Sequence, residues 1–86
     1  MSIKINENTL PIKKSGPYGI TVGHDDALWF TEWGRNQIGR ISLFGKIVEY
    51  HIPTASSEPH GLVLGSDGAI WFAEEANKIG RLVISV

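Results

Sequence analysis

The chain is built from two copies of one sequence unit. Residues 4–37 match residues 46–79 at a constant offset of 42 positions, and after one deleted residue the match resumes at an offset of 41. The identical pairs at the first offset are Lys4/Lys46, Ile5/Ile47, Glu7/Glu49, Pro11/Pro53, Ser15/Ser57, Pro17/Pro59, Gly19/Gly61, Gly23/Gly65, Asp25/Asp67, Ala27/Ala69, Trp29/Trp71, Phe30/Phe72 and Glu32/Glu74. Those at the second offset are Asn36/Asn77, Ile38/Ile79, Gly39/Gly80 and Arg40/Arg81. A repeat of about 40–45 residues has the length of one β-propeller blade.

Two copies are too few to form a closed repeat structure. A repeat unit cannot bury its own faces, and roughly three or more units are needed before a stacked core is stable. An 86-residue chain is one small domain by length and hides proportionately less surface on folding than a larger one. We therefore expect something outside this unit, such as further copies, to complete the fold.

Composition excludes several classes of function. The formal net charge of −1 gives no electrostatic reason to propose nucleic acid or an anionic membrane as a partner. The chain contains no cysteine, which rules out disulfides, zinc–thiolate sites and thiol nucleophiles. The segment Met1–Asn6 lacks the apolar stretch of a signal peptide, and no run approaches the ~18 apolar residues of a membrane span. A cytoplasmic protein is the expectation.

The apolar residues alternate or cluster in short runs bounded by turn formers, which predicts an all-β chain. The segments around His24–Asp26 and Gly65–Gly68 are expected hairpin loops, and Gly45 supplies a residue that tolerates positive φ in a further turn. The expected strands are Ile3–Asn6, Tyr18–Val22, Ala27–Thr31, Gln37–Ser42, Ile47–His51, His60–Leu64, Ala69–Ala73 and Lys78–Ile84.

The repeat register divides these strands into a single two-blade propeller unit of antiparallel meanders. Blade one covers residues 15–53 and has four strands, whereas blade two covers 57–86 and has three. The first strand, within residues 1–11, lies in register with the missing fourth strand of blade two. An N-terminal strand that completes the last blade leaves no open sheet edge, so we expect residues 1–11 to be a closing strand.

Four sequence segments resemble the virginiamycin B lyase (streptogramin B lyase) family. They are Gly16-Pro17-Tyr18-Gly19-Ile20-Thr21, Leu28-Trp29-Phe30-Thr31-Glu32, Asn36-Gln37-Ile38-Gly39-Arg40-Ile41, and Glu58-Pro59-His60-Gly61 followed by Ile70-Trp71-Phe72-Ala73. The resemblance covers almost the whole chain and implies a seven-bladed propeller. Because the Trp-Phe and Asn-x-Ile-Gly-Arg signatures recur in most blades of the family, they indicate architecture and not activity.

The resemblance also implies a site and a reaction. The family opens a cyclic depsipeptide antibiotic by elimination at an ester carbon–oxygen bond and requires Mg²⁺, which makes the implied role antibiotic resistance. It implies catalytic roles for His60 and Glu75, with His60 as the base that removes a proton alpha to a carbonyl. Tyr18 matches a substrate-binding position, and Glu58 and Glu75 match the magnesium ligands.

The chain departs from the family pattern in its size and in one wall of the cleft. It has two blades of seven, and Tyr18 stands where the family's second histidine is drawn from another blade. Identical copies joined by strand exchange would close an even number of blades, six from three copies or eight from four. The expected partner besides a small-molecule antibiotic is therefore a second copy of the chain.

Most of the repeated residues are expected to have structural roles. Trp29, Trp71, Phe30 and Phe72 occupy repeated strand positions and are expected to pack in the core. Glu32 and Glu74 follow them in both copies, and we expect them to accept hydrogen bonds from Arg40, Arg81 or the backbone. Two of the positions that differ between the copies are functional candidates: His60 replaces Tyr18, and Glu75 replaces Trp33.

Three hypotheses follow from the sequence. In the first, an assembled form retains magnesium-dependent elimination through Glu58, His60 and Glu75. In the second, the chain forms a non-catalytic propeller module that binds a peptide or small ligand through Tyr18. In the third, it is a truncated or internally deleted lyase, which predicts a marginally stable monomer with an exposed strand edge.

Overall fold

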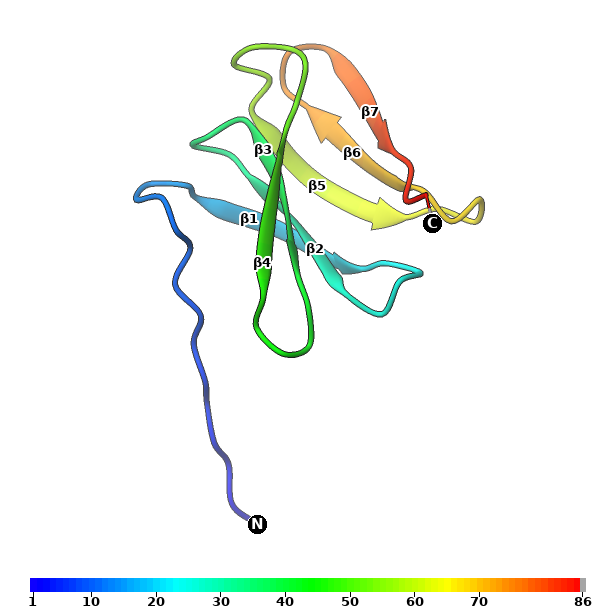
Figure 1. Cartoon of the computed structure of the whole chain (residues 1–86). Coiled ribbons are helices and arrows are strands. Elements are labelled where there is room, and N and C mark those ends of the chain that lie inside the picture. Colours follow the sequence, from blue (N-terminus) through cyan, green and yellow to red (C-terminus); the bar gives the residue numbers. More distant parts are fainter. Residues whose placement is uncertain (86) are drawn as a thin grey trace.

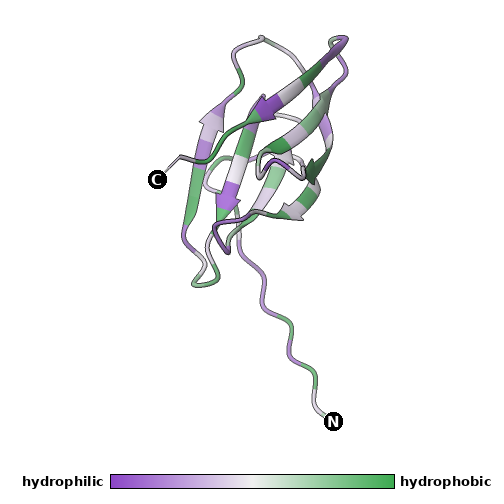
Figure 2. Ribbon diagram, turned by 90° about the vertical axis from the view of Figure 1, so that its right-hand side faces the viewer, coloured by the Kyte–Doolittle hydropathy of each residue, from purple (hydrophilic) through white to green (hydrophobic). Residues whose placement is uncertain are grey.

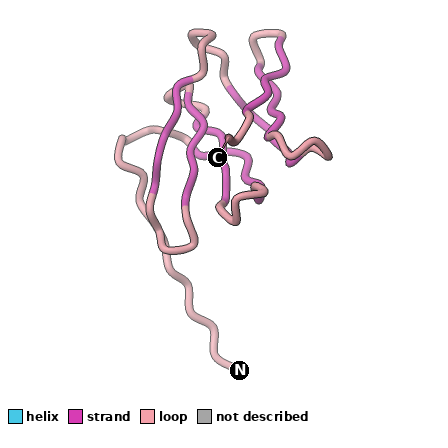
Figure 3. Tube along the Cα trace, turned by 45° about the vertical axis from the view of Figure 1, so that its right-hand side comes forward, coloured by secondary structure: helices cyan, strands magenta, loops and turns pink. Residues whose placement is uncertain are grey.

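A computed structural model describes residues 1–85, which form two antiparallel β-sheets and no helix. The first sheet has the order β1 (Pro17–Val22), β2 (Leu28–Glu32), β3 (Gln37–Ile41) and β4 (Ile47–His51). The second sheet has the order β5 (Pro59–Leu64), β6 (Ile70–Glu74) and β7 (Lys78–Leu82). Figures 1 and 3 show the two meanders side by side. The expected all-β class and the four-plus-three division are confirmed.

The strands form where apolar and polar residues alternate, and Figure 2 shows this alternation along each ribbon. Gly45 has φ 88° and lies in the turn between β3 and β4, as the sequence predicted. Gly68 has φ 83° in the turn between β5 and β6. These left-handed conformations suit glycine and allow short connections between neighbouring strands.

The core lies between the two sheets. Its buried members come from both repeats and from the connection between them: Trp29, Ile38, Ile52, Ile70 and Phe72. Strand β1 packs beside β5, so the inner strands of the two blades are neighbours. The predicted core roles are confirmed for Trp29, Phe30 and Phe72, whereas Trp71 is 36% exposed because nothing in the described chain covers its face of the second sheet.

The strand expected at Ile3–Asn6 does not form in the single chain. Residues 1–10 contain no strand and run past the turn between β3 and β4, where Asn8 lies beside Gly45, on the side opposite β7 (Figure 1). A strand needs a neighbouring edge to satisfy its backbone groups, and this tail reaches none. The second sheet therefore keeps three strands, and the closing role of residues 1–11 stays a prediction.

The arginines pair with the turn aspartates and not with the strand glutamates, which corrects the sequence prediction. Asp25 accepts hydrogen bonds from the Ala27 backbone (3.3 Å), the Trp29 indole (3.0 Å) and Arg40 Nε (2.8 Å). The second repeat has the same cluster of Asp67, Ala69, Trp71 and Arg81. Burial raises the pKa of Asp25, but the hydrogen bonds from Trp29 and Arg40 outweigh it, so the pKa is lowered.

Glu32 lies fully buried against another carboxyl group. Burial and the neighbouring Glu49 carboxyl group raise the pKa of Glu32 to about 7. The hydrogen bonds that the sequence predicted for Glu32 do not form, because both of its carboxylate oxygens are buried without a hydrogen-bond partner in the described chain.

Candidate functional site

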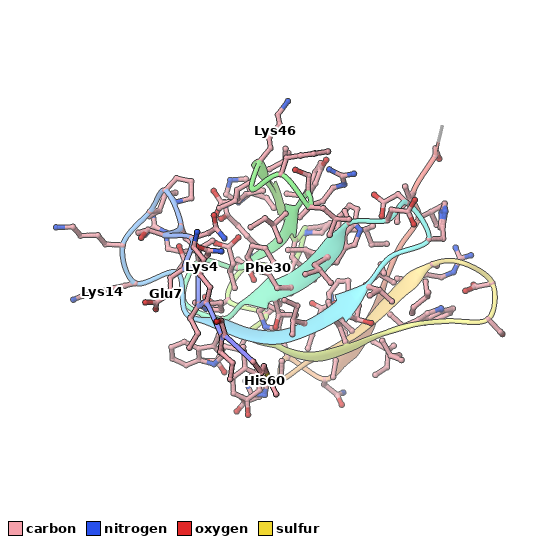
Figure 4. The ribbon with its side chains drawn as sticks, turned by 90° about the horizontal axis from the view of Figure 1, so that it is seen from below. Lys4, Glu7, Lys14, Phe30, Lys46 and His60 are labelled. Carbon is pink, nitrogen blue, oxygen red and sulfur yellow. The ribbon has the colours of Figure 1, made fainter. Side chains whose placement is uncertain are left out.

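The two repeat positions occupied by Tyr18 and His60 meet at one end of the inner strands. Their ring centroids are 5.1 Å apart with planes tilted by 46°. Tyr18 begins β1 and is 70% exposed, while His60 begins β5 and is partly buried. Figure 4 shows His60 at the rim of the two sheets. The aromatic pair offers an accessible edge to a ligand from solvent.

Glu75 joins His60 from the turn after β6. Glu75 Oε2 lies 3.3 Å from His60 Nε2, and the two side chains are 59% and 35% exposed. The turn is held against the start of β5 because the Glu75 and Ala76 amides donate to the Glu58 and Ser57 carbonyls, both over 3.3 Å. The structure thus brings two of the candidates that depart from the repeat, His60 and Glu75, into direct contact.

Thr31 fixes the backbone of His60 and was not singled out by the sequence. Its hydroxyl donates to the His60 carbonyl over 2.6 Å and accepts the Gly19 amide over 2.9 Å. The side chain is fully buried between the sheets. A signal was present, because the repeat replaces Thr31 by Ala73.

Glu58 does not join the His60–Glu75 pair through its carboxylate. It occupies a left-handed backbone conformation with φ 50°, and it lines a separate open hollow of about 570 Å³. The other lining residues are Ile12, Trp33, Gly34, Arg35, Asn36, Gln37, His51 and Ser56. None of Tyr18, His60 and Glu75 lines this hollow.

The predicted magnesium ligands do not form a complete metal centre in the chain. Among residues 1–85, no three His, Asp or Glu side chains gather closely enough to hold an ion. Mg²⁺ requires near-ideal octahedral oxygen coordination, which the Glu58 carboxylate lining the hollow and the Glu75 carboxylate beside His60 do not supply together.

No helix in the described part of the chain is long and apolar enough to cross a membrane.

The comparisons with known proteins agree with the motifs and the fold. The sequence model of the virginiamycin B lyase family matches residues 1–82. The chain belongs to this family. Its similarity to the virginiamycin B lyase of Saccharopolyspora erythraea is 51% identity over 81 residues, which is 94% of this chain and 27% of that relative. The virginiamycin B lyase of Staphylococcus aureus is 52% identical over 50 residues, 58% of this chain and 17% of that relative.

Solved structures of the family share the fold. A catalytically inactive histidine-to-alanine variant of the Staphylococcus aureus enzyme, solved with quinupristin, superposes with a TM-score of 0.84 at 51% identity. The match covers 87% of this chain and 26% of that one. A streptogramin B lyase structure gives 0.83 at 45% identity, over 88% and 26% of the two chains. The chain thus spans about a quarter of these propellers, which identifies its two sheets as blades.

Proposed function

We propose that this virginiamycin B lyase family member binds a streptogramin B antibiotic and linearises it by elimination at the ester carbon–oxygen bond. One observation carries the proposal: two candidates that depart from the repeat, His60 and Glu75, contact each other over 3.3 Å. Exposed Tyr18, beside His60, extends the same edge toward a ligand. The inactive histidine-to-alanine variant of a relative, solved with quinupristin, supports a histidine-dependent reaction on this substrate class.

The proposed chemistry uses the neutral imidazole as a general base. The Glu75 carboxylate, 3.3 Å from Nε2 of His60, favours the tautomer that carries its proton on Nε2, which leaves the Nδ1 lone pair free to accept a proton. Nδ1 takes the proton from the carbon alpha to a carbonyl, and that C–H electron pair becomes the new carbon–carbon double bond. The bond from the β-carbon to the ester oxygen breaks, and its electron pair leaves with the carboxylate. Glu75 then stabilises the imidazolium charge.

Magnesium dependence and antibiotic resistance are further parts of the proposal. Glu58 and Glu75 alone do not complete a site, so any bound ion needs oxygen ligands from water, substrate or another copy. We therefore place the activity in an assembly of copies, in which neighbouring blades enclose the cleft.

The test is to incubate the full chain with quinupristin and follow the products by chromatography and mass spectrometry. Elimination opens the ring without changing the mass, whereas hydrolysis adds one water. His60→Ala should lower the rate by roughly 10²–10⁴-fold, the usual contribution of a general base. His24→Ala, on a loop remote from the pair, is the matched control. Wild-type protein that opens quinupristin no faster than buffer, or a His60→Ala variant that retains full activity, would refute the proposal.

Ligand binding without turnover is the second candidate, favoured by the 70% exposure of Tyr18 beside His60. Calorimetry with quinupristin separates it from catalysis, because tight binding of an unchanged antibiotic supports the binding module alone. Titration with a chelator during the activity assay tests the magnesium requirement.

A further inference from the structure

The second sheet ends in an unpaired strand whose counterpart in the first sheet is fully paired. In the first sheet β4 adds to β3 with the pairs Ile41↔Ile47, Gly39↔Glu49 and Gln37↔His51. Within the described residues β7 pairs with β6 alone. An open edge of this kind is a template for another strand.

The sequence that matches β4 is the unpaired N-terminal tail. Ile5 and Glu7 are the repeat counterparts of Ile47 and Glu49. Figure 4 shows Lys46 on the outer turn of the first sheet and its counterpart Lys4 on the tail. Transferring the β3–β4 register by the repeat gives the pairs Leu82↔Ile5, Arg81↔Asn6, Gly80↔Glu7, Ile79↔Asn8 and Lys78↔Thr9.

The side-chain hydrogen bonds of Asn36 in the first blade also have no counterpart in the second blade of the single chain. The Asn36 amide donates to the carbonyls of Ile52 (3.1 Å) and Thr54 (2.8 Å), and its oxygen accepts the Ser57 amide (2.9 Å). These bonds hold the connection that follows β4. The repeat counterpart of Asn36 is Asn77, which is exposed and makes no such bonds within residues 1–85. The repeat counterparts of the three residues that Asn36 binds are Leu10, Ile12 and Ser15 on the tail.

The face of the second sheet that carries Trp71 and Ile79 is apolar and exposed to solvent. The equivalent face of the first sheet is covered by the second sheet. Ile38 is 1% exposed, but its counterpart Ile79 is 70% exposed. A Cβ added to Gly19 would lie 2.8 Å from the His60 carbonyl of the neighbouring blade, whereas a Cβ on Gly61 would meet nothing within 4 Å. The second sheet therefore lacks a neighbouring blade on this side.

The first sheet exposes, on the face that points away from the second sheet, the kind of apolar surface that packs between two blades. Leu62 and Leu64 of the second sheet pack against the core between the blades. Their counterparts in the first sheet, Ile20 and Val22, are 62% and 57% exposed. The surface that a further blade needs is thus present on the first blade.

The chain's own tail is on the wrong side to fill its own gap. Residues 52–58 connect an outer strand, β4, to the inner strand of the blade that follows it. By the same geometry residues 10–16 connect the tail to β1, so the tail belongs to a blade that precedes the first sheet. The second sheet follows the first, and Figures 1 and 3 show the tail leaving away from β7.

We propose that residues 5–9 of a second copy add to β7 as the fourth strand of the second sheet, in the register Leu82↔Ile5 to Lys78↔Thr9. The copy's face around Ile20 and Val22 packs on Val63, Trp71 and Ile79, and Asn77 holds residues 10–15 of that copy. The contact is head-to-tail, and such contacts close into rings when the rotation permits. The assembly rests on the repeat and not on the proposed activity.

The test measures native mass by light scattering for the full chain and for two variants. One variant changes the tail, and the other changes the exposed face of the second sheet. The first is Asn6→Pro with Glu7→Pro, because successive strand amides point to opposite sides and one of them must face β7. Its control is Ser2→Pro with Ile3→Pro, which precedes the paired residues. The second is Ile79→Lys, with Leu43→Lys on an exposed turn as its control. All six substitutions in these four variants lie at exposed positions, and circular dichroism verifies the fold.

Wild type and both controls should be discrete multimers, and both interface variants should be monomers. A mixture of the two interface variants should form a one-to-one dimer, because the tail of the Ile79→Lys chain still fits β7 of the proline variant. A monomeric wild type, a proline variant with the mass of its control, or a mixture that stays monomeric would overturn the proposal. Because no step involves an antibiotic, loss of the proposed lyase activity leaves this result unaffected.

Discussion

The hydroxyl of Thr31 donates a hydrogen bond to the backbone carbonyl of His60 over 2.6 Å. The bond crosses from β2 of one blade to β5 of the next, and the same oxygen accepts the Gly19 amide from β1. Three strands are thereby tied together at the point where the candidate base begins its strand. The position of His60 is therefore set by the interface between blades and not by β5 alone.

Replacing Thr31 by valine should destabilise the chain by about 1–3 kcal/mol, because the isosteric side chain leaves a buried carbonyl and a buried amide without partners. Thr31→Ser keeps the hydroxyl and should lose only about 0.8 kcal/mol for the missing methyl group. Urea unfolding followed by tryptophan fluorescence measures both. Equal losses for the two variants would show that the methyl group, and not the hydroxyl, stabilises this interface.

The buried Glu32 should make stability fall as pH rises. Burial and the neighbouring Glu49 raise its pKa from 4.5 to about 7, so the folded state holds the proton more tightly than the unfolded state. The stabilisation is fully present below pH 4.5 and is lost as pH rises through about 7. The loss is on the order of 3 kcal/mol, at 1.36 kcal/mol per pKa unit.

Glu32→Gln should remove this pH dependence, since an amide does not titrate. Urea midpoints of wild type and variant, measured across that window, give the difference directly. Asp26→Asn on the exposed turn between β1 and β2 is the control and should preserve the wild-type profile. Parallel profiles for wild type and Glu32→Gln would mean that Glu32 does not titrate in this range.

The repeat made most of the fold predictable, because two copies with the same alternation must form the same meander. Two candidates that differ between the copies, His60 and Glu75, meet in the structure. The arginine partners were not predictable in this way. Arg40 lies directly opposite Trp29 across the strand pair, so it reaches the turn aspartate and not Glu32, and only the strand register reveals this.

The magnesium ligands show a second limit of sequence reasoning. Glu58 and His60 are two residues apart, yet the left-handed backbone at Glu58 and the turn around Glu75 separate the carboxylates into different surroundings. The missing strand is a third case, because the sequence matched Ile5 to Ile47 but did not specify which sheet edge was within reach. Both outcomes depend on three-dimensional connection geometry.

The two aspartate clusters should contribute differently to the free energy of unfolding, although they consist of the same residue types. Asp25 is 16% exposed beside Arg40, whereas Asp67 is 39% exposed beside Arg81. Asp25→Asn should cost about 1–2 kcal/mol, because charged hydrogen bonds contribute more when shielded from water. Asp67→Asn should cost less, and added salt should reduce its effect further. Urea unfolding at two salt concentrations tests this order, and a larger loss for Asp67→Asn would contradict it.

The last prediction separates chain stability from assembly by using the paired asparagines. Asn36 and Asn77 have left-handed backbones with φ 57° and 67°, so glycine removes either side chain without backbone strain. Asn36→Gly should cost about 2–4 kcal/mol in the single chain, since four hydrogen bonds to residues 52–57 are lost. Asn77→Gly should leave the urea midpoint of the dilute chain nearly unchanged but lower the native mass in light scattering, because its partners belong to the tail of another copy. If Asn77→Gly destabilised the dilute chain as much as Asn36→Gly does, the tail would have to pair within its own chain.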